Sequence, residues 1–221
     1  MSVDRALGYP YDIPIHSYLI RNGTAHPWDE RYPLSGRTPV LACGSNQSPT
    51  QLARKFPFGD VPVMAGWLND YDSVYSAHFT TYGSIAATYH HGPGLRSRQM
   101  ITWLDEAQLK TMHETEALGV NYDFVTFQNI VFTSDCTQHI TKAHAYQSIR
   151  GPLKINALPV GLQAIDCKNA PYPRLNQKAL QNRIMVLFEY EGSLLKFIEQ
   201  TIKNKKERAD RTARLVALSR P

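Results

Sequence analysis

The sequence predicts an α/β chain of the α+β type, in which a run of strands is followed by helices. Three observations support this class. A strand, loop and helix pattern covers residues 38–56, strand-like segments dominate from there to residue 149, and helical periodicity begins at Arg174. The 221 residues, 43% hydrophobic and 19% charged, are typical of a globular chain that buries a core in one large or two small domains.

Residues 1–37 carry four prolines spread along the segment, at positions 10, 14, 27 and 33. Proline at such spacing prevents a long helix, so we expect an extended arm on the domain surface with at most one short helix or strand. The arm shows no residue pattern for chemistry. It could also serve as an oligomer contact.

Residues 38–56 form the segment on which the functional interpretation depends. Residues 39–43 are apolar, Gly44 opens a turn, and a helix is expected to begin at Ser48, with Pro49 at its first position and Gln51 completing a capping box. Backbone N–H groups gather where a helix follows a glycine loop, and the helix dipole adds partial positive charge. The segment is either a site for a carboxylate or polarised carbonyl, or a plain connection.

The remaining elements follow from periodicity and turn residues. Short strands are expected at residues 61–68, 71–76, 81–91 and 98–104, with a forced turn at 92–94, and a hairpin at 124–133 and 139–149. An amphipathic helix is predicted over residues 105–118. From Arg174 the helices are interrupted at Gly192, and Ser193 is expected to cap the next one. Tyr146 or Tyr172 could line a pocket or simply pack.

Glu116 is the candidate for proton transfer. It lies four residues after Met112 and seven after Leu109, which places it on the buried stripe of the predicted helix, whereas Glu114 should face water. A carboxylate turned inward is costly unless it is paired or used. Glu116 could therefore act as an acid or base, or it could be a structural residue satisfied by an arginine or by backbone donors.

The net charge of +5 comes from one segment. Residues 201–221 hold seven Lys or Arg and two Asp or Glu, which is 7 minus 2, and the remaining 200 residues sum to 17 minus 17. This basic tail could bind an acidic partner, or it could be a solvated helix face. Nucleic-acid binding is not expected, because no basic groove with interleaved aromatic residues accompanies the tail.

Other function classes are also disfavoured by the sequence. The three cysteines, Cys43, Cys136 and Cys167, are widely spaced and predict reduced thiols, and a nucleophilic Cys43 would need a neighbouring histidine that the pattern lacks. His90 and His91 lack a third ligand at a suitable spacing, so no metal is expected. With no apolar run near 18 residues and no signal-peptide core, we expect a cytoplasmic protein without a membrane segment.

Three segments, in order, resemble one family. VLACGSNQSPTQL, GSIAATYHHGPG and LDEAQLKTMHETEALGVNY are similar to the glycine loop, the Gly-Ile-Ala strand with its Pro-Gly turn, and the glutamate segment of the gamma-glutamylcyclotransferases. The three together are more specific than any one of them. They span residues 40–122, and the N-terminal arm and C-terminal helices lie outside them.

The resemblance implies a mixed or antiparallel barrel-like sheet with flanking helices. It divides the chain into an arm (1–37), a cyclotransferase-like domain (38–170) and a C-terminal helical extension (171–221). Family members cyclise a gamma-glutamyl peptide or amine to 5-oxoproline without a cofactor. Here Glu116 would be the acid and base, and the gamma-glutamyl group would be held by Leu41, Ala42, Cys43, Gly44, Ser45 and Asn46. The alternatives are an inactive small-ligand binding module and a protein that binds partners through its basic tail.

Overall fold

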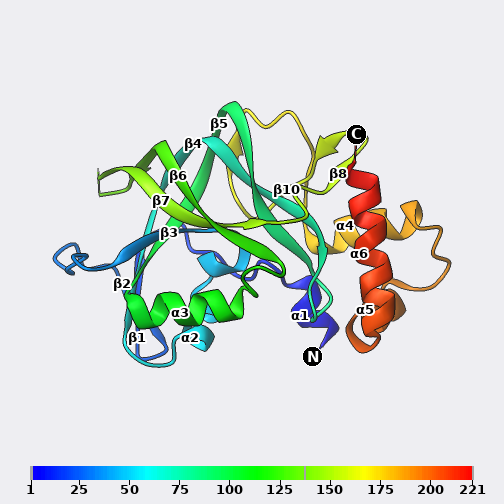
Figure 1. Cartoon of the computed structure of the whole chain (residues 1–221), viewed down its shortest axis with the longest axis horizontal. Coiled ribbons are helices and arrows are strands. Elements are labelled where there is room, and N and C mark those ends of the chain that lie inside the picture. Colours follow the sequence, from blue (N-terminus) through cyan, green and yellow to red (C-terminus); the bar gives the residue numbers. More distant parts are fainter. Residues whose placement is uncertain (1, 137, 221) are drawn as a thin grey trace.

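A closed, barrel-like sheet forms the centre of the molecule in a computed structural model that describes residues 2–136 and 138–220 (Figure 1). Its ring runs β5, β3, β7, β6, β4 and closes where β4 pairs with β5. Only the pairing of β3 with β7 is parallel in this ring. The predicted α+β class with a barrel-like mixed sheet is therefore confirmed. The ring strands are β3 (Thr38–Ala42), β4 (Asp60–Phe79), β5 (Ile85–Leu104), β6 (Tyr122–Ser134) and β7 (His139–Ser148).

Two pairs of short strands expected from the sequence are single long strands. β4 and β5 each continue for 20 residues, and the residues expected to end strands form an irregularity between Asn69 and Tyr71 instead. There Asp70 has a φ of 63°, and its Oδ1 accepts a hydrogen bond from the Gly94 N–H at 2.7 Å. The turn residues produce a bulge because the strands pair on both sides of it.

The helices beside the glycine loop pack on the outside of the barrel. A short 3-10 turn, η1 (Gly44–Gln47), leads into α2 (Pro49–Lys55), and α3 (Glu106–Thr115) follows β5. Val40 and Ala42 of β3 pack in one cluster with Leu52 of α2 and Met112 of α3, whereas Leu41 joins the cluster inside the ring. The alternation of β3 thus places every second side chain toward the helices.

The N-terminal segment is more structured than the expected arm. It contains α1 (Val3–Leu7), β1 (Tyr18–Arg21) and β2 (Thr24–Pro27), and β1 pairs with β4 as part of the sheet. Leu19 and Ile20 are buried because this pairing lays them on the barrel wall. The division of the chain at residues 37 and 170 stays a prediction.

The C-terminal helices lie on the other side of the barrel from α2 and α3 (Figure 1). They are α4 (Gln177–Leu187), α5 (Leu194–Lys203) and α6 (Lys205–Ser219), and between β7 and α4 the chain forms β8 (Lys154–Ile155), β9 (Leu158–Pro159), β10 (Gly161–Leu162), β11 (Cys167–Lys168) and β12 (Arg174–Leu175). Ser193 caps α5 as predicted, since its hydroxyl accepts the Lys196 N–H. None of the helices in the described ranges is long and apolar enough to cross a membrane.

The basic tail presents one helix face to solvent, and its other face packs on the rest of the molecule. It forms α6, whose Leu215 is buried in one cluster with Tyr75 and Phe79 of β4 and Phe197 of α5. The Arg211 side chain is only 3% exposed, and its guanidinium lies 3.8 Å from the centre of the Phe197 ring. Part of the tail's charge therefore holds the helices together.

Replacing Arg211 with methionine should lower the free energy of unfolding by about 3 kcal/mol, because several charge-assisted hydrogen bonds are lost together. Arg211 donates to the Phe197 carbonyl at 2.6 Å, to the Thr201 hydroxyl at 2.5 Å and to Gln200 Oε1 at 2.9 Å. Urea unfolding measures the change, and Lys206→Met on the exposed face of α6 is the matched control. Equal effects of the two substitutions would contradict the structural role of Arg211.

Candidate active site

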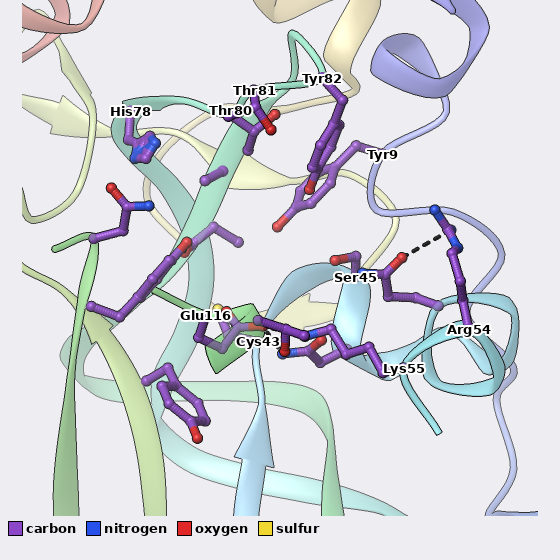
Figure 2. Close-up of a pocket in the computed structure, with 18 of the residues that line it drawn as sticks. Tyr9, Cys43, Ser45, Arg54, Lys55, His78, Thr80, Thr81, Tyr82 and Glu116 are labelled. Atoms are coloured by element: carbon purple, nitrogen blue, oxygen red, sulfur yellow. Dashed lines mark hydrogen bonds and ion pairs between the residues drawn. The ribbon is translucent and has the colours of Figure 1, made fainter. Parts of the chain in front are cut away.

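A cavity of about 560 Å³ lies where the glycine loop, α2, the end of α3 and the N-terminal segment meet (Figure 2). The loop contributes Cys43, Ser45 and Asn46, and α2 contributes Gln51, Arg54 and Lys55. The opposite wall comes from the end of β4 and the turn after it, including His78 and Tyr82. The cavity therefore joins segments that lie far apart in the sequence.

Glu116 lies at the wall of this cavity, directly after the last residue of α3. Its Oε1 accepts a hydrogen bond from Asn46 Nδ2 at 3.1 Å and forms an ion pair with Lys55 Nζ. The side chains of Glu116 and Lys55 are 15% and 7% exposed, whereas Glu114 is exposed to solvent. The structure thus brings the predicted carboxylate into direct contact with the predicted loop.

The predicted loop residues divide between the cavity and its support. Leu41, Cys43, Ser45 and Asn46 line the cavity together with Glu116. Ala42 points the other way, into the cluster beneath α2 and α3. Gly44 is buried with a φ of 57°, a backbone conformation that glycine adopts without strain.

The helix α2 begins as predicted but without the predicted capping box. Ser48 is the N-cap residue and Pro49 follows at the first helical position. Within the part of the chain that the structure describes, the buried Ser48 hydroxyl has no hydrogen-bond partner, and Gln51 accepts a bond from Arg54 instead of reaching back. The geometry of the loop is therefore fixed by other contacts.

A buried polar network behind the loop supplies those contacts. Gln99 Oε1 on β5 accepts hydrogen bonds from the Ser73 hydroxyl at 3.0 Å and from Gln47 Nε2 at 3.2 Å. The Tyr18 hydroxyl donates to the Gln47 carbonyl at 2.9 Å, and the Cys43 thiol donates to Ser73 Oγ at 3.7 Å. Both ends of the loop are thus held by the barrel, which preorganises it for a ligand.

Cys43 does not have the properties of a nucleophile. Burial raises the pKa of its thiol to about 12, so the sulfur stays protonated at neutral pH. Its hydrogen bond goes to a serine. The nucleophilic interpretation of Cys43 therefore has no support in the structure, and Glu116 stays the candidate for proton transfer.

Three tyrosines that the sequence did not indicate also lie at the cavity. Tyr9 and Tyr82 project into the same space that Glu116, Cys43 and Lys55 reach from the opposite side, and Tyr122 lines it too (Figure 2). Burial, followed by the nearby phenol of Tyr122, raises the pKa of Tyr9 well above its usual value, so its hydroxyl is available as a donor. No local pattern could reveal Tyr9, because its place depends on the packing of the N-terminal segment.

Tyr146 also lines the cavity, one of the two alternatives for the tyrosines of the later segments. Its hydroxyl is 2.7 Å from His113 Nδ1. Tyr172 lies elsewhere and donates to the buried carboxylate of Asp72 at 3.0 Å. Of these two tyrosines, Tyr146 is therefore the one that lies at this cavity.

Lys55 was also missed, although a signal was present. It lies three residues after the buried Leu52 and seven after Ser48, so helical periodicity turns it inward. With Lys55, Arg5 and Arg54 against Glu116, the charged groups of the cavity lining sum to 3 minus 1, or +2, and its histidine is neutral. The cavity thus suits a ligand that carries a carboxylate.

His78 should make stability depend on pH. Burial, helped by Arg150 and Arg208, lowers its pKa from 6.5 to about 4. Between these two values the unfolded chain binds a proton that the folded chain does not, so stability falls as the pH drops from 6.5 toward 4, by up to about 3 kcal/mol.

Urea unfolding at pH 7 and at pH 4.5 tests this expectation. The His78→Gln variant should lose much less stability over this range than the parent. The exposed His16, changed to Gln, is the control and should leave the pH dependence unchanged. An equally steep pH dependence in His78→Gln would show that other groups cause it.

The described residues contain no set of side chains suited to bind a metal ion. No group of three or more His, Cys, Asp or Glu side chains there could hold a metal ion. The polar groups that line the cavity are one carboxylate, three cations, amides, hydroxyl groups, the Cys43 thiol and a buried imidazole.

Fold and site together define a class: a barrel-like α+β protein with a carboxylate and lysine pair enclosed beside a glycine loop. Comparison with protein-family models finds no match, and neither does comparison with curated protein sequences. Among solved structures, the chain is similar to a gamma-glutamyl cyclotransferase at a TM-score of 0.43 and 14% identity, covering 51% of this chain and 66% of that one.

Two further solved structures are similar to the chain at a comparable level. For an uncharacterized protein from Homo sapiens the TM-score is 0.44 at 14% identity, covering 52% of this chain and 68% of that one. For a protein from Arabidopsis thaliana it is 0.41 at 14% identity, covering 81% and 90%. Since all three scores are low, a function has to be inferred from the site itself.

Proposed function

We propose that the protein catalyses intramolecular acyl transfer on a gamma-glutamyl peptide or amine and releases 5-oxoproline. The observation that carries this proposal is the hydrogen bond between Asn46 of the glycine loop and the Glu116 carboxylate at one positively charged cavity. A gamma-glutamyl compound carries an amine, a carboxylate and an acyl carbonyl, and the cavity offers a partner for each.

The reaction joins two groups of one substrate molecule. Within the described part of the chain, Glu116 Oε2 accepts no hydrogen bond, which leaves it for the substrate amine. As the amine nitrogen attacks the gamma-carbonyl carbon, Glu116 takes its proton and the carbonyl electron pair moves onto oxygen. The electron pair on oxygen then re-forms the carbonyl as the bond to the leaving nitrogen breaks, and Glu116 returns the proton to that nitrogen, so that atoms and charge balance.

The protein's other contributions are orientation and charge stabilisation. The loop of Cys43, Gly44, Ser45 and Asn46 would hold the gamma-glutamyl group, and the neutral Tyr9 hydroxyl is a donor for the developing oxyanion. Binding the substrate with its amine next to its carbonyl carbon lowers the entropic part of the activation barrier for ring closure.

The test is release of 5-oxoproline. Purified protein is offered gamma-glutamyl amino acids, gamma-glutamyl amines and glutathione, and the product is measured by chromatography. We expect at least one substrate to be cyclised at a rate proportional to enzyme concentration. If none of the three classes yields 5-oxoproline above the uncatalysed rate, the proposed reaction is wrong.

A second candidate function is a catalytically inactive module that binds a small carboxylate ligand. The observation in its favour is that Glu116 Oε1 is already engaged by Lys55 and Asn46, as expected for a structural carboxylate. A thermal shift with 5-oxoproline or glutamate, without turnover of any gamma-glutamyl compound, would favour this function.

A further inference from the structure

The ion pair of Lys55 and Glu116 is complementary in charge to the head group of an α-amino acid, whose amine is positive and whose carboxylate is negative. An α-amino acid carries its amine and its carboxylate on one carbon, so the two groups always lie next to each other. Lys55 Nζ and Glu116 Oε1 are in direct contact at the cavity wall. A ligand that places its amine on Glu116 therefore brings its carboxylate to Lys55.

We infer that Lys55 binds the α-carboxylate of the gamma-glutamyl group and thereby restricts the enzyme to substrates that carry it. This inference rests on the proposed function and adds a specificity-determining residue to it. The charges of the pair would determine substrate preference. A substrate with an amine alone can pair with Glu116, whereas a substrate that also carries a neighbouring carboxylate can pair with Lys55 as well.

The surroundings of Lys55 leave its ammonium short of partners. The group has three N–H donors. The ammonium contacts Glu116 and also Met112 Sδ, a weak acceptor, at 3.3 Å. No further acceptor for Lys55 is found in the described ranges, although the side chain is only 7% exposed. A buried cation with one charged partner is poorly compensated, and a ligand carboxylate would provide the second.

The position of Lys55 on a packed helix supports a recognition role. α2 is anchored by Leu52, which is fully buried beneath it, so the lysine stem starts from a fixed place. Arg54 of the same helix and Arg5 of α1 also line the cavity and add positive charge around it. The three cations together therefore attract a carboxylate into the cavity, and Lys55 is the residue that binds it.

The experiment compares two substrates that differ only in the α-carboxylate. Gamma-glutamyl anilide and 4-aminobutyryl anilide both carry the amine and the acyl carbonyl, and they cyclise to 5-oxoproline and 2-pyrrolidinone with release of aniline. We expect the parent to prefer the gamma-glutamyl substrate in kcat/KM. In Lys55→Met this preference should shrink about 10- to 100-fold, which corresponds to the free energy of one charge-assisted hydrogen bond.

Two further variants make the comparison specific. Lys55→Arg keeps the charge and should retain more of the preference than Lys55→Met. Lys110→Met, an exposed lysine of α3, should leave both rates as in the parent. A preference that stays the same in Lys55→Met while both rates fall together would show that Lys55 acts only by orienting Glu116, and would overturn the inference.

Binding of the products separates this inference from the proposed function. Calorimetry with 5-oxoproline and 2-pyrrolidinone should show tighter binding of 5-oxoproline to the parent, and loss of that difference in Lys55→Met. If no substrate is turned over but the Lys55-dependent difference is present, the reaction is wrong and the inference holds. If turnover occurs but neither preference depends on Lys55, the inference is wrong and the reaction holds.

Discussion

Replacing Glu116 with glutamine should lower kcat/KM for 5-oxoproline release by about 1,000-fold, within the range that general acid and base catalysis supplies. The amide keeps the size of the side chain and can still contact Asn46, but it cannot take the amine proton or return it to the leaving nitrogen. The measurement is the steady-state rate with a gamma-glutamyl substrate at several concentrations. Both kcat and kcat/KM should fall, because the lost step is chemical.

The control for this substitution is Glu114→Gln. Glu114 lies in the last turn of α3 but faces solvent, so its loss removes the same charge from the same region without touching the cavity. The rate should stay within about twofold of the parent, since an exposed charge contributes little. Circular dichroism establishes that both variants are folded. A Glu116→Gln protein as fast as the parent would remove Glu116 from the mechanism.

Replacing Gly44 with alanine should lower the free energy of unfolding by about 3 kcal/mol and disturb the loop that forms the site. Two costs add at this position. Its φ of 57° strains any residue with a side chain, and an added Cβ would overlap the Tyr9 hydroxyl and lie 2.8 Å from the Ala87 Cβ. Urea unfolding gives the stability change, and turnover by the folded fraction shows the displacement of the loop.

Gly119→Ala separates the cost of backbone strain from the cost of the steric overlap with Tyr9 and Ala87. Gly119 also has a positive φ, of 75°, but no atom lies within 4 Å of its added Cβ. Only the backbone strain remains there, so we expect a loss of about 1 kcal/mol. Combining Gly44→Ala with Tyr9→Phe should recover part of the difference. Equal costs at Gly44 and Gly119 would show that Tyr9 does not press on the loop.

Much of the secondary structure follows from local chemistry. Ser193 caps its helix, the hairpin of β6 and β7 forms where β-branched and aromatic residues alternate, and Asp105 starts α3 with a capping box. These elements depend on neighbours within a few residues, so a single sequence contains what decides them. The periodicity that turned Glu116 inward belongs to the same category.

Other expectations were wrong because distant partners decide them. The residues around Asp70 and Gly94 look like strand ends, yet the long pairing of β4 with β5 continues past them as a bulge. Ser48 has the sequence of a capping box, but its buried hydroxyl makes no capping hydrogen bond to the helix. The tail keeps the solvated helix face that was one of its two interpretations, but Arg208 and Arg211 also donate to carbonyl groups on α5.

The sequence by itself determined the glycine loop, the helix that follows it and the inward direction of Glu116, because periodicity and turn chemistry act over short distances. Only the tertiary structure decided that Lys55 pairs with Glu116 and that Tyr9 closes over Gly44. Closure of the barrel and docking of the N-terminal segment bring these groups together. The physical reason is that a cavity is made by packing between segments remote in the chain, and no local pattern encodes which side chains will face each other across it.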